Sequence, residues 1–152
     1  MADFSEVKKE LGRYCRHYRH PKLPPVQVSG LYALFPEKYA QLPKEVIARW
    51  PDDDWPNAEM PGVYILLDSK LTVRYIGRTS MWSSLKTRLS AYFRYADPVS
   101  KRCKIPPEHG WDVKPEFVAT IGVPFKTGFE ASAIEEYLIA RLQPPDNTIG
   151  IQ

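Results

Sequence analysis

The sequence predicts an α+β fold, in which a small three-stranded antiparallel sheet is flanked by helices and preceded by an N-terminal extension of helix and extended chain. The first observation is a pair of β-branched and aromatic runs, 62–67 (GVYILL) and 71–76 (LTVRYI), separated by the polar residues 68–70. Two such runs joined by a short polar loop are typical of a β-hairpin. A third run, 117–123 (FVATIGV), predicts the third strand.

Two segments with apolar residues at every third or fourth position predict the flanking helices. The first is capped by Ser83 or Ser84 and runs to about Tyr95. The second runs from about Phe129 to Leu142 and ends before Pro144. The apolar side of the first helix consists of Leu85, Leu89, Tyr92, Phe93 and Ala96.

The region before Asn57 is expected to extend the compact unit. Residues 4–19 have the spacing of a short amphipathic helix, which Pro21 ends, and extended chain follows. A second helix is expected from Pro43 to Arg49, before a linker rich in proline and aspartate. The predicted division is an N-terminal extension, 1–57, and a compact domain, 58–152.

Length and composition limit the classes of protein to consider. A chain of 152 residues with 43% hydrophobic content is expected to bury a core as one domain. No apolar run approaches the roughly eighteen residues that a membrane span needs, and residues 1–20 do not resemble a secretory signal. Cys15 and Cys103 are isolated, so we expect reduced thiols in a cytoplasmic protein.

Positive charge is concentrated in the middle of the chain. Between Lys70 and Lys104 there are nine Lys or Arg residues and one acidic residue, Asp97, although the net charge of the chain is only +3. Tyrosines and a tryptophan alternate with these cations, as they do in polyanion-binding surfaces. A solvated charged face explains the same pattern equally well, so charge alone does not decide between them.

The final predicted helix carries an acidic residue on its apolar side. At about 100° per residue, Glu135 points into the middle of an apolar stripe, whereas Glu136 points to solvent. An ionised carboxylate facing a core is costly unless a cation or several donors meet it. A metal ion or an arginine would satisfy Glu135, and a salt-bridged structural glutamate is the alternative. The stripe consists of Ala131, Ile134, Leu138, Ile139 and Leu142.

Two tyrosines and an arginine are further candidates for a site. Tyr64 and Tyr75 lie on neighbouring strands of the predicted hairpin and should approach one another near its open end. Nearby cations would lower a phenol pKa, so the pair could hold and deprotonate a water, unless it is simple cross-strand packing. Arg88, beside Tyr92 on its helix, could reach a phosphate or lie along the surface.

Smaller signals surround these candidates. Gly62 and Gly77 would permit close approach of a ligand to the backbone. Cys15, with two nearby histidines, resembles half of a zinc site, but no second pair with suitable spacing follows. The N-terminal helix either contacts DNA through its basic residues or covers an edge of the sheet. Positive field at the tyrosines would come from Arg74, Arg78 and Arg88.

Taken together, these residues resemble the signature of the GIY-YIG nucleases. The run Gly62-Val63-Tyr64 is followed after ten residues by Tyr75-Ile76-Gly77. The likeness covers about Met60 to Ile149 and is nearest to the N-terminal nuclease domain of the bacterial excision-repair subunit UvrC. It continues in order and spacing through 85–93, 135–139, Pro144 and Asn147.

The resemblance implies a divalent-metal-dependent endonuclease that hydrolyses phosphodiester bonds in DNA. Tyr64 would be the favoured general base and Tyr75 would position the water or the phosphate, although the two roles are exchangeable. Arg88 would stabilise the charged phosphate. Glu135 would bind one Mg²⁺ or Mn²⁺ ion, and Asn147 would brace the site.

The substrate contacts follow from the same resemblance. Arg78 stands where relatives often carry lysine, which keeps the charge but changes the donor geometry. The loop 81–84 departs from the repair-type pattern. The substrate-binding residues implied are Gly77, Arg78, Lys86 and Arg74.

Two other interpretations stay open. One is a nucleic-acid-binding module of the same fold without turnover. The other is a structural domain in which Glu135 pairs with an arginine far from Tyr64. DNA is the expected partner and a membrane is not. The sequence identifies neither the DNA specificity nor the oligomeric state, for which a homodimer is one option.

Overall fold

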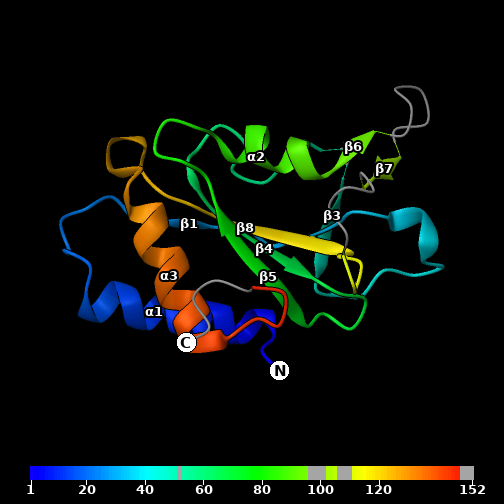
Figure 1. Ribbon diagram of the computed structural model, residues 1–152, viewed down its shortest axis with the longest axis horizontal. Helices are drawn as coiled ribbons and strands as arrows, with labels where there is room; N and C mark the ends of the chain where they lie inside the picture. Colours follow the sequence, from blue (N-terminus) through cyan, green and yellow to red (C-terminus); the bar gives the residue numbers. More distant parts are fainter. Residues whose placement is uncertain (51–52, 96–101, 106–110, 148–152) are drawn as a thin grey trace.

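The computed structural model describes residues 1–50, 53–95, 102–105 and 111–147, and its centre is one six-stranded sheet (Figure 1). The strands of this sheet are β1 (Gln27–Val28), β2 (Leu31–Ala33), β3 (Val46–Arg49), β4 (Gly62–Leu67), β5 (Val73–Arg78) and β8 (Phe117–Gly122). Their order is β3-β2-β8-β4-β5, and β1 also pairs with β8. The helices are α1 (Phe4–His17), α2 (Leu85–Tyr92) and α3 (Glu130–Leu142), and a separate short pair consists of β6 (Arg94–Tyr95) and β7 (Cys103–Lys104).

The α+β class is confirmed, but the sheet is larger than predicted and mixed in direction. Strand β4 pairs antiparallel with β5 on one side and with β8 on the other. Strands β1 and β2 pair with the other edge of β8, and β3 runs parallel to β2. A three-stranded antiparallel sheet is therefore too small a description, because the region before Asn57 supplies three more strands to the same sheet.

Strands β1 and β2 follow one edge of β8 as an interrupted strand. Between them, the Ser29 N–H donates to the Thr120 carbonyl at 2.9 Å. The Ser29 hydroxyl accepts from the Thr120 N–H at 2.8 Å. A side chain thus replaces a backbone partner where the strand is interrupted, and the extended region stays attached to the sheet.

The predicted helix from Pro43 to Arg49 is wrong, because Val46–Arg49 forms strand β3. The prediction required Val46, Ile47 and Trp50 to face a core together, but burial alternates along the strand and Ile47 is exposed. β-Branched residues favour strands, and a helix this short is marginal by itself. Pairing with β2 decides the conformation, since it provides backbone hydrogen bonds that the isolated segment lacks.

Strand β4 is buried on both faces, because helices cover the sheet from both sides (Figure 1). Val63, Ile65 and Leu67 belong to the apolar cluster that includes residues of α1 and α3. Tyr64 and Leu66 belong to the cluster that includes residues of α2. Double coverage explains why the sequence has a continuous apolar run here, without the alternation of a strand that has one face in water.

The N-terminal helix is confirmed as α1, which starts after Asp3. Asp3 and Glu6 form a capping box at its first turn. Val7 and Leu11 are buried in the cluster shared with α3, and Arg19, just after the helix, forms a buried ion pair with Glu130 at 2.9 Å. These contacts fit a helix that covers the sheet, and contact with DNA stays a prediction.

The remaining predicted helices are present with adjusted ends. Helix α2 is capped by Ser84 but ends at Tyr92, because Phe93 is extended and leads into β6. Ala96, also predicted for this helix, lies outside the described residues. Helix α3 ends at Leu142, where the next residue is left-handed. Among the residues described, no helix is long and apolar enough to cross a membrane.

Strand β5 is the outermost strand of the sheet, and other parts of the chain occupy its free edge. The Val73 N–H donates to the Ala2 carbonyl at 2.9 Å. The Asn147 side chain accepts from the Ile76 N–H at 2.9 Å and donates to the Ile76 carbonyl at 2.8 Å. A single buried amide thus imitates a neighbouring strand and closes the edge.

We expect Asn147→Ala to lower the free energy of unfolding by about 2 to 3 kcal/mol, because the buried N–H and carbonyl of Ile76 lose their partners. Urea denaturation followed by circular dichroism measures the change. Gln41→Ala, which removes an exposed amide, is the control and should change the unfolding free energy by less than about 0.5 kcal/mol. Equal effects of the two substitutions would contradict the role given to the Asn147 amide.

Candidate active site

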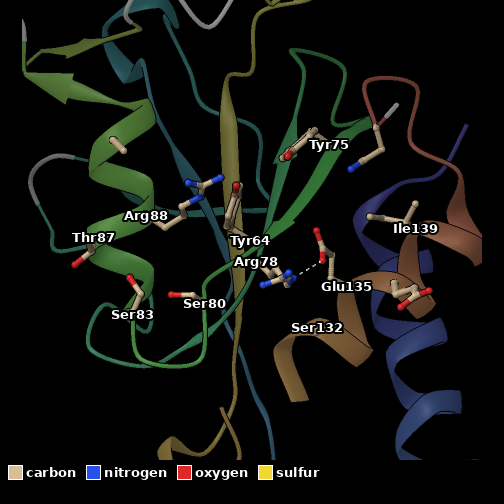
Figure 2. Close-up of a pocket in the computed structure, with 13 residues that line it drawn as sticks. Tyr64, Tyr75, Arg78, Ser80, Ser83, Thr87, Arg88, Ser132, Glu135 and Ile139 are labelled. Atoms are coloured by element: carbon tan, nitrogen blue, oxygen red, sulfur yellow. Dashed lines mark ion pairs between the residues drawn. The ribbon is translucent and has the colours of Figure 1, made fainter. Parts of the chain in front are cut away.

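A pocket of ≈ 820 Å³ opens at strand β5 between α2 and α3 (Figure 2). Hydroxyl groups of Ser80, Ser83 and Ser132 contribute to its wall, as does Arg78. The structure therefore brings together every side chain for which the sequence suggested a catalytic role. They come from β4, β5, α2, α3 and the chain after α3. These are Tyr64, Tyr75, Arg88, Glu135 and Asn147.

The pocket crosses the edge of the sheet. Tyr64 lies on the face covered by α2, whereas Glu135 comes from α3 on the other face. Figure 2 shows Arg88 and Glu135 on opposite sides of Tyr64. Because β5 is the last strand, groups from both faces meet around it without a further strand between them.

Two glycines make close internal packing possible, Gly77 on the edge strand β5 and Gly62 on β4 next to β8. A Cβ atom at Gly77 would lie 2.3 Å from both Cζ and the hydroxyl oxygen of Tyr64. A Cβ atom at Gly62 would lie 2.1 Å from the Ile121 carbonyl oxygen. The protein's own Tyr64 ring thus occupies the space beside Gly77 that the sequence suggested for a ligand, and the role of Gly77 as a substrate contact stays a prediction.

Four aromatic rings form a cluster around the pocket. The ring centroids of Tyr64 and Tyr75 are 6.1 Å apart, and those of Tyr64 and Tyr92 are 5.8 Å apart. Trp111 completes the cluster, at 5.6 Å from Tyr75. Arg88 donates to the Tyr92 hydroxyl at 3.3 Å. Sequence reasoning did not assign Tyr92 a functional role, although its position one helical turn after Arg88 was the available signal.

Burial controls the acidity of the two predicted catalytic phenols. It raises the pKa of Tyr75 to about 12, with Tyr92 as a second cause. Burial raises the pKa of Tyr64 further, and the neighbouring Tyr75 adds to the effect. The expectation that nearby cations lower these pKa values is wrong for the protein without ligands, because Arg88 opposes the rise at Tyr64 only in part.

The Tyr64 hydroxyl is a buried polar group without a partner. Its side chain is fully buried, and within the described ranges no group meets the hydroxyl in hydrogen-bond geometry, although Arg88 is close enough to affect its pKa. Buried hydroxyls are rarely left unsatisfied, because each lost hydrogen bond costs free energy. A hydroxyl of this kind on the wall of a pocket indicates that a ligand or a water completes it.

Glu135 occupies the half-buried position that its helical phase predicted. Its carboxylate forms an ion pair with Arg78, and the Arg78 Nε lies 3.0 Å from Oε2 of Glu135. The Glu135 side chain is 22% exposed. Burial raises the pKa of Glu135, and Arg78 opposes that rise. Of the two partners expected for this carboxylate, the arginine is present. The structural interpretation expected Glu135 to pair with an arginine and to lie far from Tyr64. The arginine partner is present, but Tyr64 lines the same pocket as Glu135.

The donor set around Glu135 suits a hard cation that keeps most of its water. Among the residues that the structure describes, no group of three or more His, Cys, Asp or Glu side chains comes together, and this includes the region of Cys15. Magnesium commonly binds through one or two carboxylates together with waters and phosphate oxygens. Glu135, facing a pocket lined with hydroxyls, fits that kind of site once Arg78 releases it.

Besides Gly77, two predicted substrate contacts, Arg74 and Lys86, lie outside the pocket wall. The guanidinium of Arg74 binds both oxygens of Asp146, at 3.1 and 2.9 Å. Lys86 is half exposed and lies near Asp54, at 3.5 Å, on the outer side of α2. Their roles in binding DNA stay predictions, and the structure gives each of them a carboxylate partner.

Comparisons with known proteins give one relative. The chain is 34% identical over 89 residues to UvrABC system protein C of Microcystis aeruginosa (strain NIES-843 / IAM M-2473). The match covers 59% of this chain but only 13% of the length of that relative. No family profile and no solved structure matches the chain. The chain is thus similar to one part of this relative, and the likeness supports the superfamily resemblance.

Proposed function

We propose that this protein is a divalent-metal-dependent endonuclease that hydrolyses phosphodiester bonds in DNA. The observation that carries the proposal is the convergence of Tyr64, Tyr75, Arg88 and Glu135 on one pocket, although they come from four separate elements. Periodicity alone predicted the inward Glu135, and the GIY-YIG resemblance names the same four residues. The likeness to UvrABC system protein C supports a nuclease-related function.

Binding of a phosphodiester would begin with the two arginines of the pocket. Arg88 lies beside Tyr64 and presents a planar set of donors suited to phosphate oxygens. Arg78 is 42% exposed and holds Glu135. An incoming phosphate would compete for the Arg78 guanidinium and would free the carboxylate, so substrate and cation would favour each other's binding.

Glu135 would hold one Mg²⁺ or Mn²⁺ ion. When bound, the ion supplies positive charge to the phosphate oxygens as they gain negative charge. Arg88 would donate to the same oxygens from the α2 side of the pocket. Asn147 would keep the β5 backbone in place next to Tyr75, through its two hydrogen bonds to Ile76.

The tyrosines would hold the attacking water and take up its proton. As the oxygen–phosphorus bond forms, the proton of the water passes to a phenolate, and the bond from phosphorus to the leaving oxygen breaks. The leaving oxygen keeps the electron pair of that bond and takes up a proton from solvent. Tyr75 is the easier phenol to ionise in the free protein, since its pKa is raised to about 12 and that of Tyr64 is raised further. Tyr64, which the resemblance favours as the base, needs more positive field from Arg88 and the cation.

The alternative is a nucleic-acid-binding module that keeps the fold without turnover. The ion pair between Arg78 and Glu135 favours it, because it neutralises the proposed metal ligand. The module would bind DNA in the presence of a chelator and would never nick supercoiled plasmid with Mg²⁺ or Mn²⁺. Nicking that appears with either ion and disappears with chelator supports the endonuclease.

We expect Glu135→Ala to reduce metal-dependent cleavage by at least about a hundredfold while the protein stays folded. Arg78 is partly exposed, so loss of its partner should cost little stability. Initial rates of plasmid nicking measure the effect, and thermal unfolding checks the fold. Glu45→Ala, which removes an exposed carboxylate that does not line the pocket, is the control and should retain the activity. Undiminished cleavage by Glu135→Ala would exclude the single-ion assignment.

The pH dependence of cleavage should identify the base. A general base acts in its deprotonated form, and burial raises both phenol pKa values above their ordinary value, further from neutrality. The rate should therefore rise with pH by up to about tenfold per unit between pH 7 and 9. Replacing the general base by phenylalanine should remove this dependence on pH. The comparison of Tyr64→Phe with Tyr75→Phe therefore shows which tyrosine is the base. If both variants keep the wild-type rate and profile, neither phenol is the base.

A further inference from the structure

Two neighbouring loops present exposed aromatic side chains at one end of the pocket. Trp82 is 80% exposed, Phe125 65% and Phe129 63%. The loops, 80–84 and 124–129, touch each other, because a Cβ atom at Gly128 would lie 2.8 Å from the Met81 carbonyl oxygen. Figure 1 shows both loops at the same end of the molecule. We call Trp82, Phe125 and Phe129 the aromatic platform.

The aromatic platform is continuous with the proposed active site. Ser80 and Ser83, which flank Trp82 in the chain, line the pocket. Phe129 precedes Ser132, another lining residue, by three positions at the start of α3, so both lie on one side of the helix. Both loops of the platform therefore adjoin residues of the pocket wall.

The charge around the aromatic platform favours a polyanion. Neither loop contains an acidic residue, and Lys126 lies between the two phenylalanines. Arg78 stands at the entrance where the first loop leaves β5. Exposed aromatic side chains gathered in one place mark a binding site more often than scattered single ones do. A surface that has cations beside aromatic rings can bind the phosphates and the bases of a nucleic acid.

We propose that the aromatic platform stacks against unpaired bases next to the phosphate held in the pocket. The choice of nucleic acid rests on the proposed function. In a duplex, base faces are stacked on one another, so side chains such as Trp82 can stack only on bases that have left the helix. The preferred substrate class is therefore DNA with a single-stranded segment, such as an overhang, a flap or a branch, and continuous duplex is a poor substrate.

The four tryptophans allow binding to be observed directly. Trp50 and Trp55 are 3% and 4% exposed, and Trp111 is half-buried, so Trp82 is the tryptophan that a quencher in solution reaches. With chelator present to prevent cleavage, oligothymidylate should quench the Trp82 emission, and a blunt duplex of equal length should quench it much less. Trp82→Ala should weaken single-strand binding by roughly five- to hundredfold and leave duplex binding nearly unchanged.

Two further variants test the chemistry of stacking. Trp82→Phe keeps an aromatic face and should retain most of the single-strand affinity. Tyr18→Ala removes an aromatic side chain that is 71% exposed and packs against Tyr137 of α3, outside both platform loops, and it should have no effect on that affinity. Cleavage assays on overhang, flap and blunt duplex should show the same order of preference in the wild-type protein, and loss of that preference in Trp82→Ala.

The outcomes separate this inference from the proposed function. Single-strand binding that depends on Trp82, without cleavage of any DNA, would overturn the nuclease proposal and leave the aromatic platform intact. Equal binding of single strand and duplex, unchanged in Trp82→Ala, would overturn the platform even if the protein cleaves DNA. A dimer that Trp82→Ala dissociates, with DNA binding unaffected, would overturn it as well, because a second copy would then cover these residues.

Discussion

Strand β4 must bury both of its faces, and the rest of the structure depends on that constraint. A strand of this kind needs a paired strand on each edge and a layer of helices on each side, which β5, β8, α2 and the α1–α3 pair supply. Double burial also encloses Tyr64, a side chain with a polar end. Its hydroxyl is left in an apolar setting at the pocket, where its pKa rises and its hydrogen bonds are incomplete.

Because β5 lies at the edge of the sheet, the neighbouring core strand β4 can contribute Tyr64 to the pocket. Gly77 leaves space for the Tyr64 ring, and in the described part of the chain no strand pairs with the outer edge of β5 to separate the two faces of the sheet. The Asn147 amide completes the backbone of β5 without adding a strand. Side chains from α2 and α3 therefore reach one volume, while the sheet edge stays protected from pairing with another chain.

The ionisable side chains with a proposed role in the pocket are either paired or neutral in this structure. Glu135 is paired with Arg78, both phenols stay protonated at neutral pH, and Arg88 donates to the neutral hydroxyl of Tyr92. In the proposed reaction, each of these groups would change partner when a cation and a phosphate bind together. Such an exchange needs little movement, because the groups already line the same pocket and differ mainly in which charge they face.

The sequence alone determined the features that depend on local periodicity. The β4–β5 hairpin, helix α1, the cap of α2 and the inward phase of Glu135 on α3 all follow from spacing along the chain. These features were enough to predict three residues of the candidate site, because the direction of Tyr64, Tyr75 and Glu135 depends on the strand or helix to which each belongs. Arg88, whose place beside Tyr92 also follows from helical spacing, lies on the pocket wall, and so does Asn147, which only the family resemblance named.

Only the tertiary structure decided which groups become partners. Residues 46–49 form a strand because β2 offers them a ladder, Arg74 is paired because Asp146 returns to it after α3, and the phenol pKa values rise because several elements bury them. Tyr92 joins the site for the same reason, through rings contributed by other elements. Spacing along a chain specifies which way a side chain points, whereas its partner, its burial and its charge depend on residues far away in sequence.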